Sequence, residues 1–352
     1  KEIKKINNNN IPLANSIDNV IGEKEIANHW KTHFSNILNS SNNVDSKEFV
    51  LNECNNTRKL YLKRITAMEV SEAIKSLKNG KTAGLDNMYG EHYKYAHNKI
   101  HVLLALLFNA MIIHNFLPKA FMDTTLVPLI KDRKGIVTSS DNYRPLAITC
   151  VVSKILELIL LERYNDLLQT SDNQFGFKKK HATDMCIYTL KHVVDYFQSM
   201  NSAVYICFLD ASKAFDKVNH WKLFHKLIVR NVPYIIVRIL VTWYATQLFY
   251  VSWGNTLSDS FTVLNGVRQG GILSPILFNV YMNDLSVLLN NVHIGCFIND
   301  KPYNFLFYAG GSALLEPTPA ALQKLISLCE SYAIDADLTY NTKKTVCLSV
   351  LQ

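Results

Sequence analysis

Apolar residues recur along the chain with the spacings of both helices and strands. Within residues 151–168 they return every three or four positions, which predicts an amphipathic helix. The run 203–209 is wholly apolar and rich in β-branched and aromatic residues, so it predicts a buried strand. Residues 23–39 predict an early helix, and residues 345–350 predict a final strand.

Two dipeptides mark the starts of further helices. Ser274-Pro275 and Thr318-Pro319 each place a hydroxyl side chain before a proline. This order suits an N-cap followed by the first helical position. The first pair predicts a helix that ends near Leu289, and the second predicts a helix with an apolar face.

A glycine pair stands between two apolar arms near the end of the chain. Phe305–Tyr308 and Ser312–Leu315 flank Gly310 and Gly311. The pattern predicts a hairpin with a two-residue turn, because such turns require positive φ angles. Strands separated by helices or long excursions predict an α+β fold.

Long apolar and long polar stretches bear on two questions: whether the chain crosses a membrane, and where its globular part begins. The stretches 101–117 and 234–253 are interrupted by polar and charged residues, so they are expected to be buried helices and not membrane spans. No membrane is therefore expected as a partner. Residues 1–20 and 40–60 are polar and predict a loose end and a linker, so that 1–60 forms a polar and helical extension.

Charge and cysteine content narrow the possible partners and compartment. The 352 residues have a net charge of +8, mainly from the first 200 residues. A basic surface suits nucleic acid, but solubility also explains a mild excess. The seven cysteines are scattered without a C-x-x-C pair, which argues against zinc or a disulfide framework. They indicate a reducing intracellular compartment, either nucleus or cytoplasm.

Two segments place chemically informative residues at element ends. Asp210 follows the predicted buried strand, where a carboxylate is costly unless it meets a cation, a metal or backbone donors. Capping of the next turn is the structural alternative. Gly266–Pro275 is a glycine-containing loop that runs into a helix start, which permits close approach to a ligand or simply makes a tight turn.

Seven segments in this order resemble the reverse transcriptase of non-LTR (LINE-type) retrotransposons, over roughly residues 65–350. The segments are Lys81–Asp86, Asn142–Ile148, Gln174–Phe177, Leu209–Asp216, Arg268–Pro275, the hairpin around Tyr308, and Asn341–Thr345. The resemblance implies a right-hand polymerase, with fingers at 61–200, a palm at 201–352 and a missing thumb. It implies an RNA template, a DNA primer and a dNTP as partners, and two Mg²⁺ ions for nucleotidyl transfer.

The resemblance also assigns roles at the catalytic centre. Asp210 would be a catalytic, metal-binding carboxylate, and Lys343 or Lys344 would stand near the pyrophosphate leaving group. Phe215 would be the gate against a ribose 2′-OH, although a plain core aromatic is the alternative. A surface lysine pair is the common alternative for residues 343 and 344.

Further roles concern the nucleotide and the template. Arg144, with Lys131, would contact the triphosphate, since a guanidinium suits bidentate phosphate binding. A solvated loop charge is the alternative for Lys131. Gln269, Gly270 and Tyr308 would line the nucleotide pocket. Lys178, Lys179, Lys180 and His181 would contact the template backbone or form a solvated charge run.

The chain departs from the family pattern at Gly310 and Gly311, where the family has two metal-binding aspartates. Asp216 and Glu316 offer no obvious replacement. The implied function is therefore a reverse transcriptase domain that is catalytically impaired or dead. The alternatives are a non-catalytic protein that binds RNA or an RNA–DNA hybrid, and a relic without function. Decay, domestication and engineering all explain the glycines.

Overall fold

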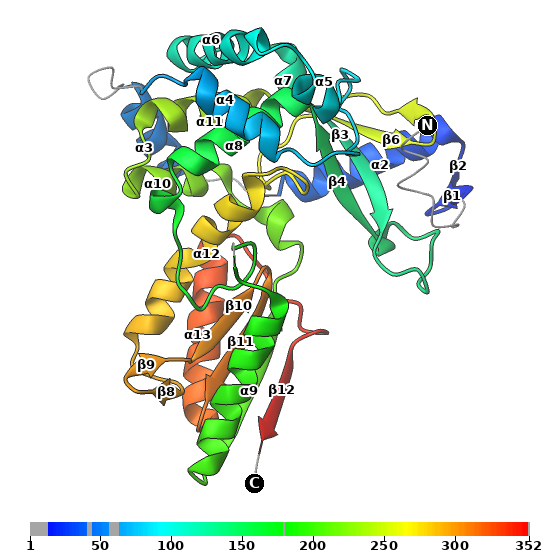
Figure 1. Ribbon diagram of the computed structural model, residues 1–352. Helices are drawn as coiled ribbons and strands as arrows, with labels where there is room; N and C mark the ends of the chain where they lie inside the picture. The colour runs from blue at the N-terminus through cyan, green and yellow to red at the C-terminus, as the bar shows by residue number, and fades with distance from the viewer. Residues whose placement is uncertain (1–12, 41–43, 56–62, 179, 351–352) are drawn as a thin grey trace.

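The computed structural model describes residues 13–40, 44–55, 63–178 and 180–350 (Figure 1). A mainly helical region with one four-stranded sheet lies above a second four-stranded sheet with its own helices in this view. The fold is a mixture of helices and mainly antiparallel strands, so the predicted α+β class is confirmed.

The elements follow in chain order. The helices are α2 (Glu23–Leu38), α3 (Val44–Asn55), α4 (Ala67–Ser76), α5 (Gly90–Lys94), α6 (Lys99–His114), α7 (Lys119–Met122), α8 (Val151–Arg163), α9 (Thr183–Ser199), α10 (His220–Val229), α11 (Tyr234–Thr246), α12 (Ser274–Asn291) and α13 (Pro319–Asp335). Short 3₁₀ turns are η2 (Ser140–Asn142), η3 (Asp166–Leu168) and η4 (Ala214–Lys217). The strands are β1 (Ser16–Ile17), β2 (Val20–Ile21), β3 (Asp123–Ile130), β4 (Tyr143–Thr149), β5 (Val204–Asp210), β6 (Leu248–Trp253), β7 (Thr256–Leu257), β8 (Phe297–Ile298), β9 (Lys301–Pro302), β10 (Phe305–Tyr308), β11 (Gly311–Glu316) and β12 (Val346–Val350).

The lower sheet has the antiparallel order β10-β11-β5-β12. Its side chains alternate between two buried faces, as the period of a strand requires. Cys207 and Leu209 belong to the core shared with α12 and α13, whereas Val204 and Ile206 pack with Val193 of α9. The sheet is thus a middle layer between helices, and the predicted strand at 203–209 is its β5.

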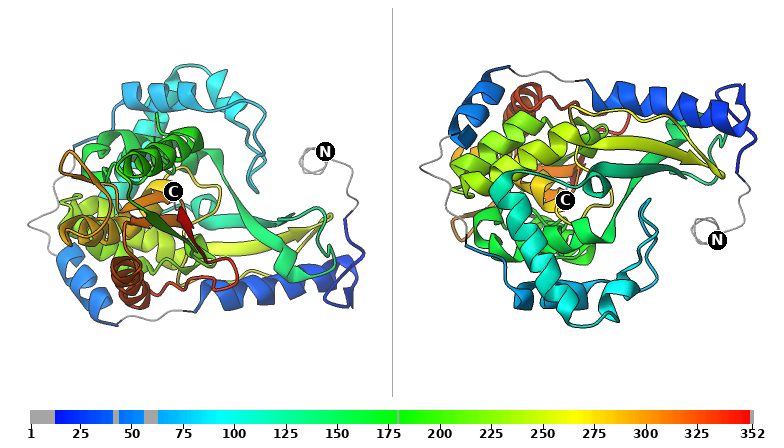
Figure 2. Two further views of the ribbon diagram at one scale, coloured as in Figure 1. Left: turned by 90° about the horizontal axis from the view of Figure 1, so that it is seen from below. Right: turned by 90° about the horizontal axis from the view of Figure 1, so that it is seen from above.

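The upper sheet has the order β4-β3-β6-β7 and supports the N-terminal helix. β3 pairs antiparallel with β4 and parallel with β6. Trp30 of α2 packs against Tyr143 and Trp253 of this sheet, with ring centroids 5.0 and 5.9 Å apart. Both views of Figure 2 show α2 running along these strands.

Three sequence expectations are wrong in part. The predicted linker 40–60 contains α3, which packs against α10. The predicted loose end 1–20 holds the β1–β2 hairpin, with Ile17 fully buried, while residues 1–12 lie outside the described part. The predicted helix 234–253 divides at Gln247 into α11 and β6, because residues 248–251 pair with β3.

The predicted helix at 101–117 is present as α6, but it is buried on one face only. Leu103 and Leu106 are 60% and 63% exposed, because the helix lies at the outer edge of the molecule in both views of Figure 2. No helix within the described residues is long and apolar enough to cross a membrane.

Helix starts were predicted with mixed success. Thr318 caps α13, since its hydroxyl accepts a hydrogen bond from the backbone of Ala321. Ser274 is the first residue of α12 and makes no capping hydrogen bond, so its predicted cap role is wrong. Asn219 caps α10, since its side-chain oxygen accepts from the backbones of Trp221 and Lys222.

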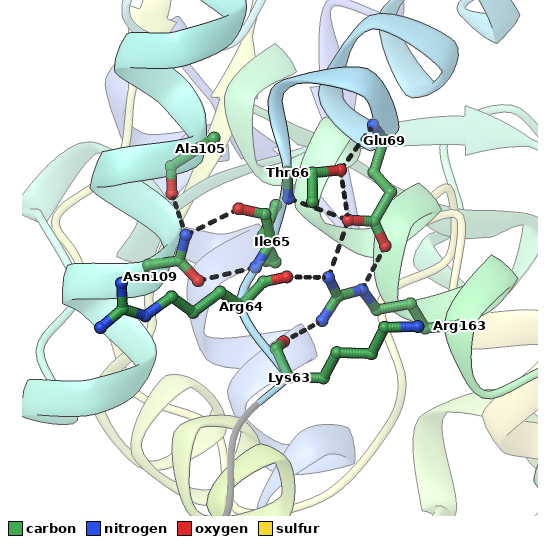
Figure 3. Close-up of polar contacts among 8 residues, drawn as sticks. All are labelled: Lys63, Arg64, Ile65, Thr66, Glu69, Ala105, Asn109 and Arg163. Carbon is green, nitrogen blue, oxygen red and sulfur yellow. Dashed lines mark hydrogen bonds and ion pairs between the residues drawn. The ribbon is translucent and has the colours of Figure 1, made fainter.

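A polar network joins the segment at the start of α4 to α8 and α6 (Figure 3). Arg163 of α8 donates to both carboxylate oxygens of Glu69 and to the carbonyls of Lys63 and Arg64. Glu69 also closes a capping box with Thr66 at the start of α4. The hydrogen bond from Arg163 lowers the pKa of Glu69 to about 2. The segment 63–69 is therefore tied down at both backbone and side chains.

We expect Arg163→Met to lower the free energy of unfolding by roughly 2 kcal/mol at pH 7, because it leaves a half-buried carboxylate and two carbonyls without their donor. Urea unfolding followed by circular dichroism measures this change. Arg64→Met is the matched control, since Arg64 enters the network through its carbonyl only. Equal stability of the two variants would contradict the role of the guanidinium.

Candidate active site

Five of the seven segments named above contribute described residues to one cavity where the two sheets adjoin, and Lys81–Asp86 and Asn341–Thr345 do not. Its volume is about 440 Å³. Its walls come from β3 and β4, the turn after β5, the loop before α12 and the β10–β11 turn. The lining residues are Leu129, Arg144, Pro145, Leu146, Phe177, Ala211, Lys213, Ala214, Phe215, Gln269, Gly270, Pro275, Ala309 and Gly310. Of the predicted residues, the cavity therefore unites Arg144, Phe215, Gln269, Gly270 and Gly310.

Asp210 lies beside this cavity at the end of β5. Gly311 is its direct partner on β11, and the backbone of Ala211 donates to the carbonyl of Gly310 at 2.9 Å. The Lys344 ammonium is 3.4 Å from Asp210 Oδ2. Asp210 therefore faces the glycine pair and has a lysine as counter-charge.

The hairpin turn is formed by Ala309 and Gly310, and its strained residue differs from the prediction. Ala309 has a φ of 54°, while neither Gly310 nor Gly311 has a positive φ. A Cβ at Gly310 would lie 3.4 Å from Ala214 Cβ, and one at Gly311 would lie 3.5 Å from the carbonyl of Tyr308. The turn thus does not require glycine at 310 or 311, and it has room for side chains there.

The described residues do not fit a pair of Mg²⁺ ions at Asp210. Magnesium sites in proteins use several convergent oxygen ligands. Within the described ranges, no group of three or more His, Cys, Asp or Glu residues is placed to hold a metal ion. Glu316 lies at the opposite end of β11, opposite Tyr205. Asp216 is buried and accepts a hydrogen bond from Gln269 Nε2 at 2.8 Å.

Asp216 is the second acidic group near the cavity. Burial raises its pKa to about 6, although Gln269, Lys213 and Lys131 act in the opposite direction. The carboxylate lies behind the cavity wall, since Gln269 lines the cavity and Asp216 does not. Its position indicates a role in orienting the Gln269 side chain.

Three cations surround the cavity. Arg144 and Lys213 line it and are exposed. Lys131 lies outside the lining, and its ammonium donates to the carbonyl of Asp141 at 2.8 Å. Burial, followed by the charge of Lys213, lowers the pKa of Lys131. Sequence reasoning missed Lys213, although its place between Asp210 and Phe215 was an available signal.

Phe215 combines core packing with a place in the cavity wall. Its ring stacks on Phe278 with centroids 4.5 Å apart and meets Phe177 edge-on at 5.5 Å. Both alternatives for this residue thus describe part of its environment. The packing fixes the ring at the cavity, which is a requirement for a steric gate.

The segment Gln174–Phe177 holds the hairpin in place. The backbone of Phe175 donates to the carbonyl of Phe307, and Phe307 donates to the carbonyl of Asn173, both at 2.8 Å. A Cβ on Gly176 would be only 2.4 Å from the backbone nitrogen of Ala309, so this contact requires glycine. The motif therefore positions the β10–β11 turn.

The basic run after this segment is only partly available to a template. The Lys178 ammonium donates to the carbonyls of Thr170 and Ser171 at 2.7 and 2.5 Å. Lys179 lies outside the described residues, and Lys180 is exposed. Tyr308 and Lys343 are also exposed and do not line the cavity.

The loop before α12 is anchored by a buried ion pair. Arg268 Nη2 is 2.7 Å from Glu157 Oε1, and Glu157 also accepts from the backbones of Ile272 and Leu273. A Cβ on Gly270, whose φ is +120°, would lie 2.6 Å from the carbonyl of Ala147. Sequence reasoning gave Glu157 no role beyond a non-apolar helix position. The ion pair and the close contact at Gly270 therefore hold the loop against β4.

Comparison with known proteins agrees with this geometry. A family model described as reverse transcriptase (RNA-dependent DNA polymerase) matches residues 130–350, more than half of the chain. The chain therefore belongs to the reverse transcriptase family.

Its curated relatives include transposon proteins. The probable RNA-directed DNA polymerase from transposon BS of Drosophila melanogaster is 29% identical over 264 residues, which cover 74% of this chain and 29% of that protein. The RNA-directed DNA polymerase from mobile element jockey of Drosophila funebris is 25% identical and covers 80% of this chain and 31% of its own length. These relatives confirm the predicted non-LTR type. The chain spans less than a third of either relative.

Solved structures with some likeness include telomerases. The apo telomerase of Candida tropicalis, truncated from its C-terminal domain, is 13% identical with a TM-score of 0.47. The match covers 71% of this chain and 56% of that one.

His220 links stability to pH next to this site. Its Nε2 lies 2.8 Å from the carbonyl of Gly266, at the start of the anchored loop, and burial lowers its pKa from 6.5 to about 4. The unfolded chain therefore binds a proton at this residue before the folded chain does. The contribution of His220 to stability is complete above about pH 6.5 and is lost as pH falls toward 4.

We expect His220→Gln to remove about 2–3 kcal/mol of this pH dependence, because glutamine can donate to Gly266 but does not titrate. Urea unfolding of both proteins at pH 7.5 and 4.5 measures it, and other titrating groups cancel in the difference. Parallel stability curves for the two proteins would show that His220 does not titrate as described.

Proposed function

We propose that this chain is a reverse transcriptase domain that holds an RNA template and a DNA primer but does not catalyse nucleotidyl transfer. The observation that supports this proposal best is the pairing of Gly311 with Asp210 across the β5–β11 ladder. A residue in that register has its Cβ about 5 Å from its partner's, which is where a second carboxylate would meet Asp210.

Loss of the carboxylates removes the means of activating the primer. In two-metal nucleotidyl transfer, one ion activates the attacking hydroxyl and the other stabilises the leaving group. Asp210 alone, with Lys344 beside it, does not supply ligands for both. When one of several catalytic groups that act jointly is removed, the reaction rate falls on the order of 10⁴-fold.

The remaining residues keep features of a nucleotide and template site. Arg144 would meet the phosphates of a dNTP, Phe215 would face its sugar, and Gln269 and Gly270 would lie at the nucleotide and template. Lys180 and Lys343 are exposed cations that suit contacts to nucleic acid backbone. Residues 61–200 would serve as fingers and 201–352 as palm, although β6, from the second range, pairs with β3 from the first.

We expect the chain to bind an RNA–DNA hybrid with an affinity that falls linearly with salt on logarithmic scales, because phosphate contacts release counterions. We also expect no primer extension above background. Fluorescence anisotropy with a labelled hybrid measures binding, and gel analysis of the labelled primer with all four dNTPs and Mg²⁺ measures extension.

The matched variant is Gly310→Asp/Gly311→Asp, which fits the space at the turn. Asp210→Ala in the unmodified chain is expected to leave hybrid binding intact. Primer extension by the unmodified chain that disappears in Asp210→Ala would refute the loss of catalysis. If the folded chain does not bind the hybrid, the proposal that it holds template and primer is refuted.

A further inference from the structure

The cavity that bears the family motifs is lined by cations without an acidic counterpart. Arg144 and Lys213 are its two charged lining residues, and no carboxylate is among the described residues that line it. In the described part of the chain, neither cation has a hydrogen-bond or ion-pair partner. Both charges are therefore available to a ligand.

The neighbouring acids are outnumbered by cations, and neither of them lines the cavity. Asp210 has the Lys344 ammonium at 3.4 Å, and Asp216 is buried behind Gln269, which donates to it at 2.8 Å. Lys131 adds a further positive charge near Lys213. A ligand in the cavity thus meets an excess of fixed positive charge.

This charge balance is the reverse of a two-metal site. Several carboxylates around phosphate oxygens repel the ligand, and divalent ions must stand between them. Glycine at 310 and 311 removes two such charges, while Arg144 and Lys213 stay. A planar guanidinium binds two phosphate oxygens at once, and an ammonium adds a point charge. The site therefore no longer needs a metal to neutralise a polyphosphate.

The walls favour a nucleotide over bare phosphate. Phe177, Phe215, Leu146 and Pro275 give the cavity an apolar side next to its cations. The volume of about 440 Å³ lies in the range of small-molecule sites. Apolar walls with a few convergent polar groups suit a sugar and base attached to the phosphates.

We propose that this cavity binds a deoxynucleoside triphosphate as the metal-free anion, with Arg144 and Lys213 neutralising the phosphates, so that Mg²⁺ weakens binding. The inference rests on the proposed loss of catalysis at this site. In an active relative the substrate site depends on divalent ions, whereas in this chain Mg²⁺ would weaken binding at the same site. The reason is that a magnesium–nucleotide complex presents about two fewer negative charges to the same cations.

Isothermal titration calorimetry with dTTP tests this inference at constant ionic strength, once in EDTA and once with millimolar Mg²⁺. We expect binding in EDTA and a Kd at least about threefold higher in Mg²⁺, from the reduced charge of the ligand. Arg144→Gln and Lys213→Gln are each expected to weaken binding in EDTA about tenfold. Lys324→Gln, an exposed cation on α13 away from the cavity, is expected to change nothing.

The decisive variant is Gly310→Asp/Gly311→Asp. Restored carboxylates should repel dTTP in EDTA and make its binding stronger in Mg²⁺, which reverses the sign of the metal effect. The inference is overturned if the unmodified chain binds dTTP only with Mg²⁺, or if the two glycine positions do not alter the metal effect.

Two further probes separate the possible sources of phosphate. Inorganic triphosphate that binds as tightly as dTTP would overturn the nucleotide assignment, and so would complete displacement of dTTP by short single-stranded DNA at equal phosphate concentration. Hybrid binding is measured on the same samples. A chain that binds hybrid but not dTTP refutes only this inference, whereas a folded chain that binds neither also refutes the proposed function.

Discussion

The buried ion pair between Glu157 and Arg268 organises the candidate site. Both side chains are almost fully excluded from solvent, and Arg268 also packs over the ring of Trp243. Isolated, each charge would be very costly in the core, so the two elements that hold them must stay together. The second carboxylate oxygen of Glu157 accepts hydrogen bonds from two backbone amides, those of Ile272 and Leu273, in the loop before α12. These bonds anchor the loop that carries Gln269 and Gly270, and Asp216 accepts a hydrogen bond from the Gln269 side chain. The loop that forms one wall of the cavity is thus held by an ion pair outside the cavity.

The contacts that hold the hairpin turn are separate from the side-chain positions of residues 310 and 311. Gly176 against Ala309, and Phe175 paired with Phe307, hold the β10–β11 turn by backbone contacts alone. None of these contacts uses a side chain at 310 or 311. Aspartates at 310 and 311 would leave these backbone contacts in place and would add charge repulsion around Asp210. The interactions that support the fold at this turn thus lie away from the side-chain positions of residues 310 and 311.

Local patterns predicted the elements that carry their own signal. The hairpin at 305–315 and α13 each combine apolar positions with a turn or cap residue, and β5 is a wholly apolar run. Long-range pairing decided the rest: residues 248–253 continue an apolar helical stretch in sequence, yet they form β6 because β3 offers a parallel partner. The anchor role of Glu157 had no local signal at all, since a glutamate within a helix normally predicts an exposed position. The Lys178 ammonium likewise meets two carbonyls that no sequence pattern places beside it.

Asp210 makes contacts within the fold that do not involve a metal. Its carbonyl accepts a hydrogen bond from the backbone of Asn341 at 2.8 Å, and its carboxylate faces Lys344 just before β12. The same stretch continues with Ser212, whose backbone donates to the carbonyl of Thr339 at 2.8 Å. Asp210 therefore helps to join the last strand to β5, on both its backbone and its side chain. Gly310 and Gly311 hold the sheet through their backbone, and the positive φ of the turn falls on Ala309. The contacts of Asp210 therefore include a side chain, whereas those of the hairpin glycines do not.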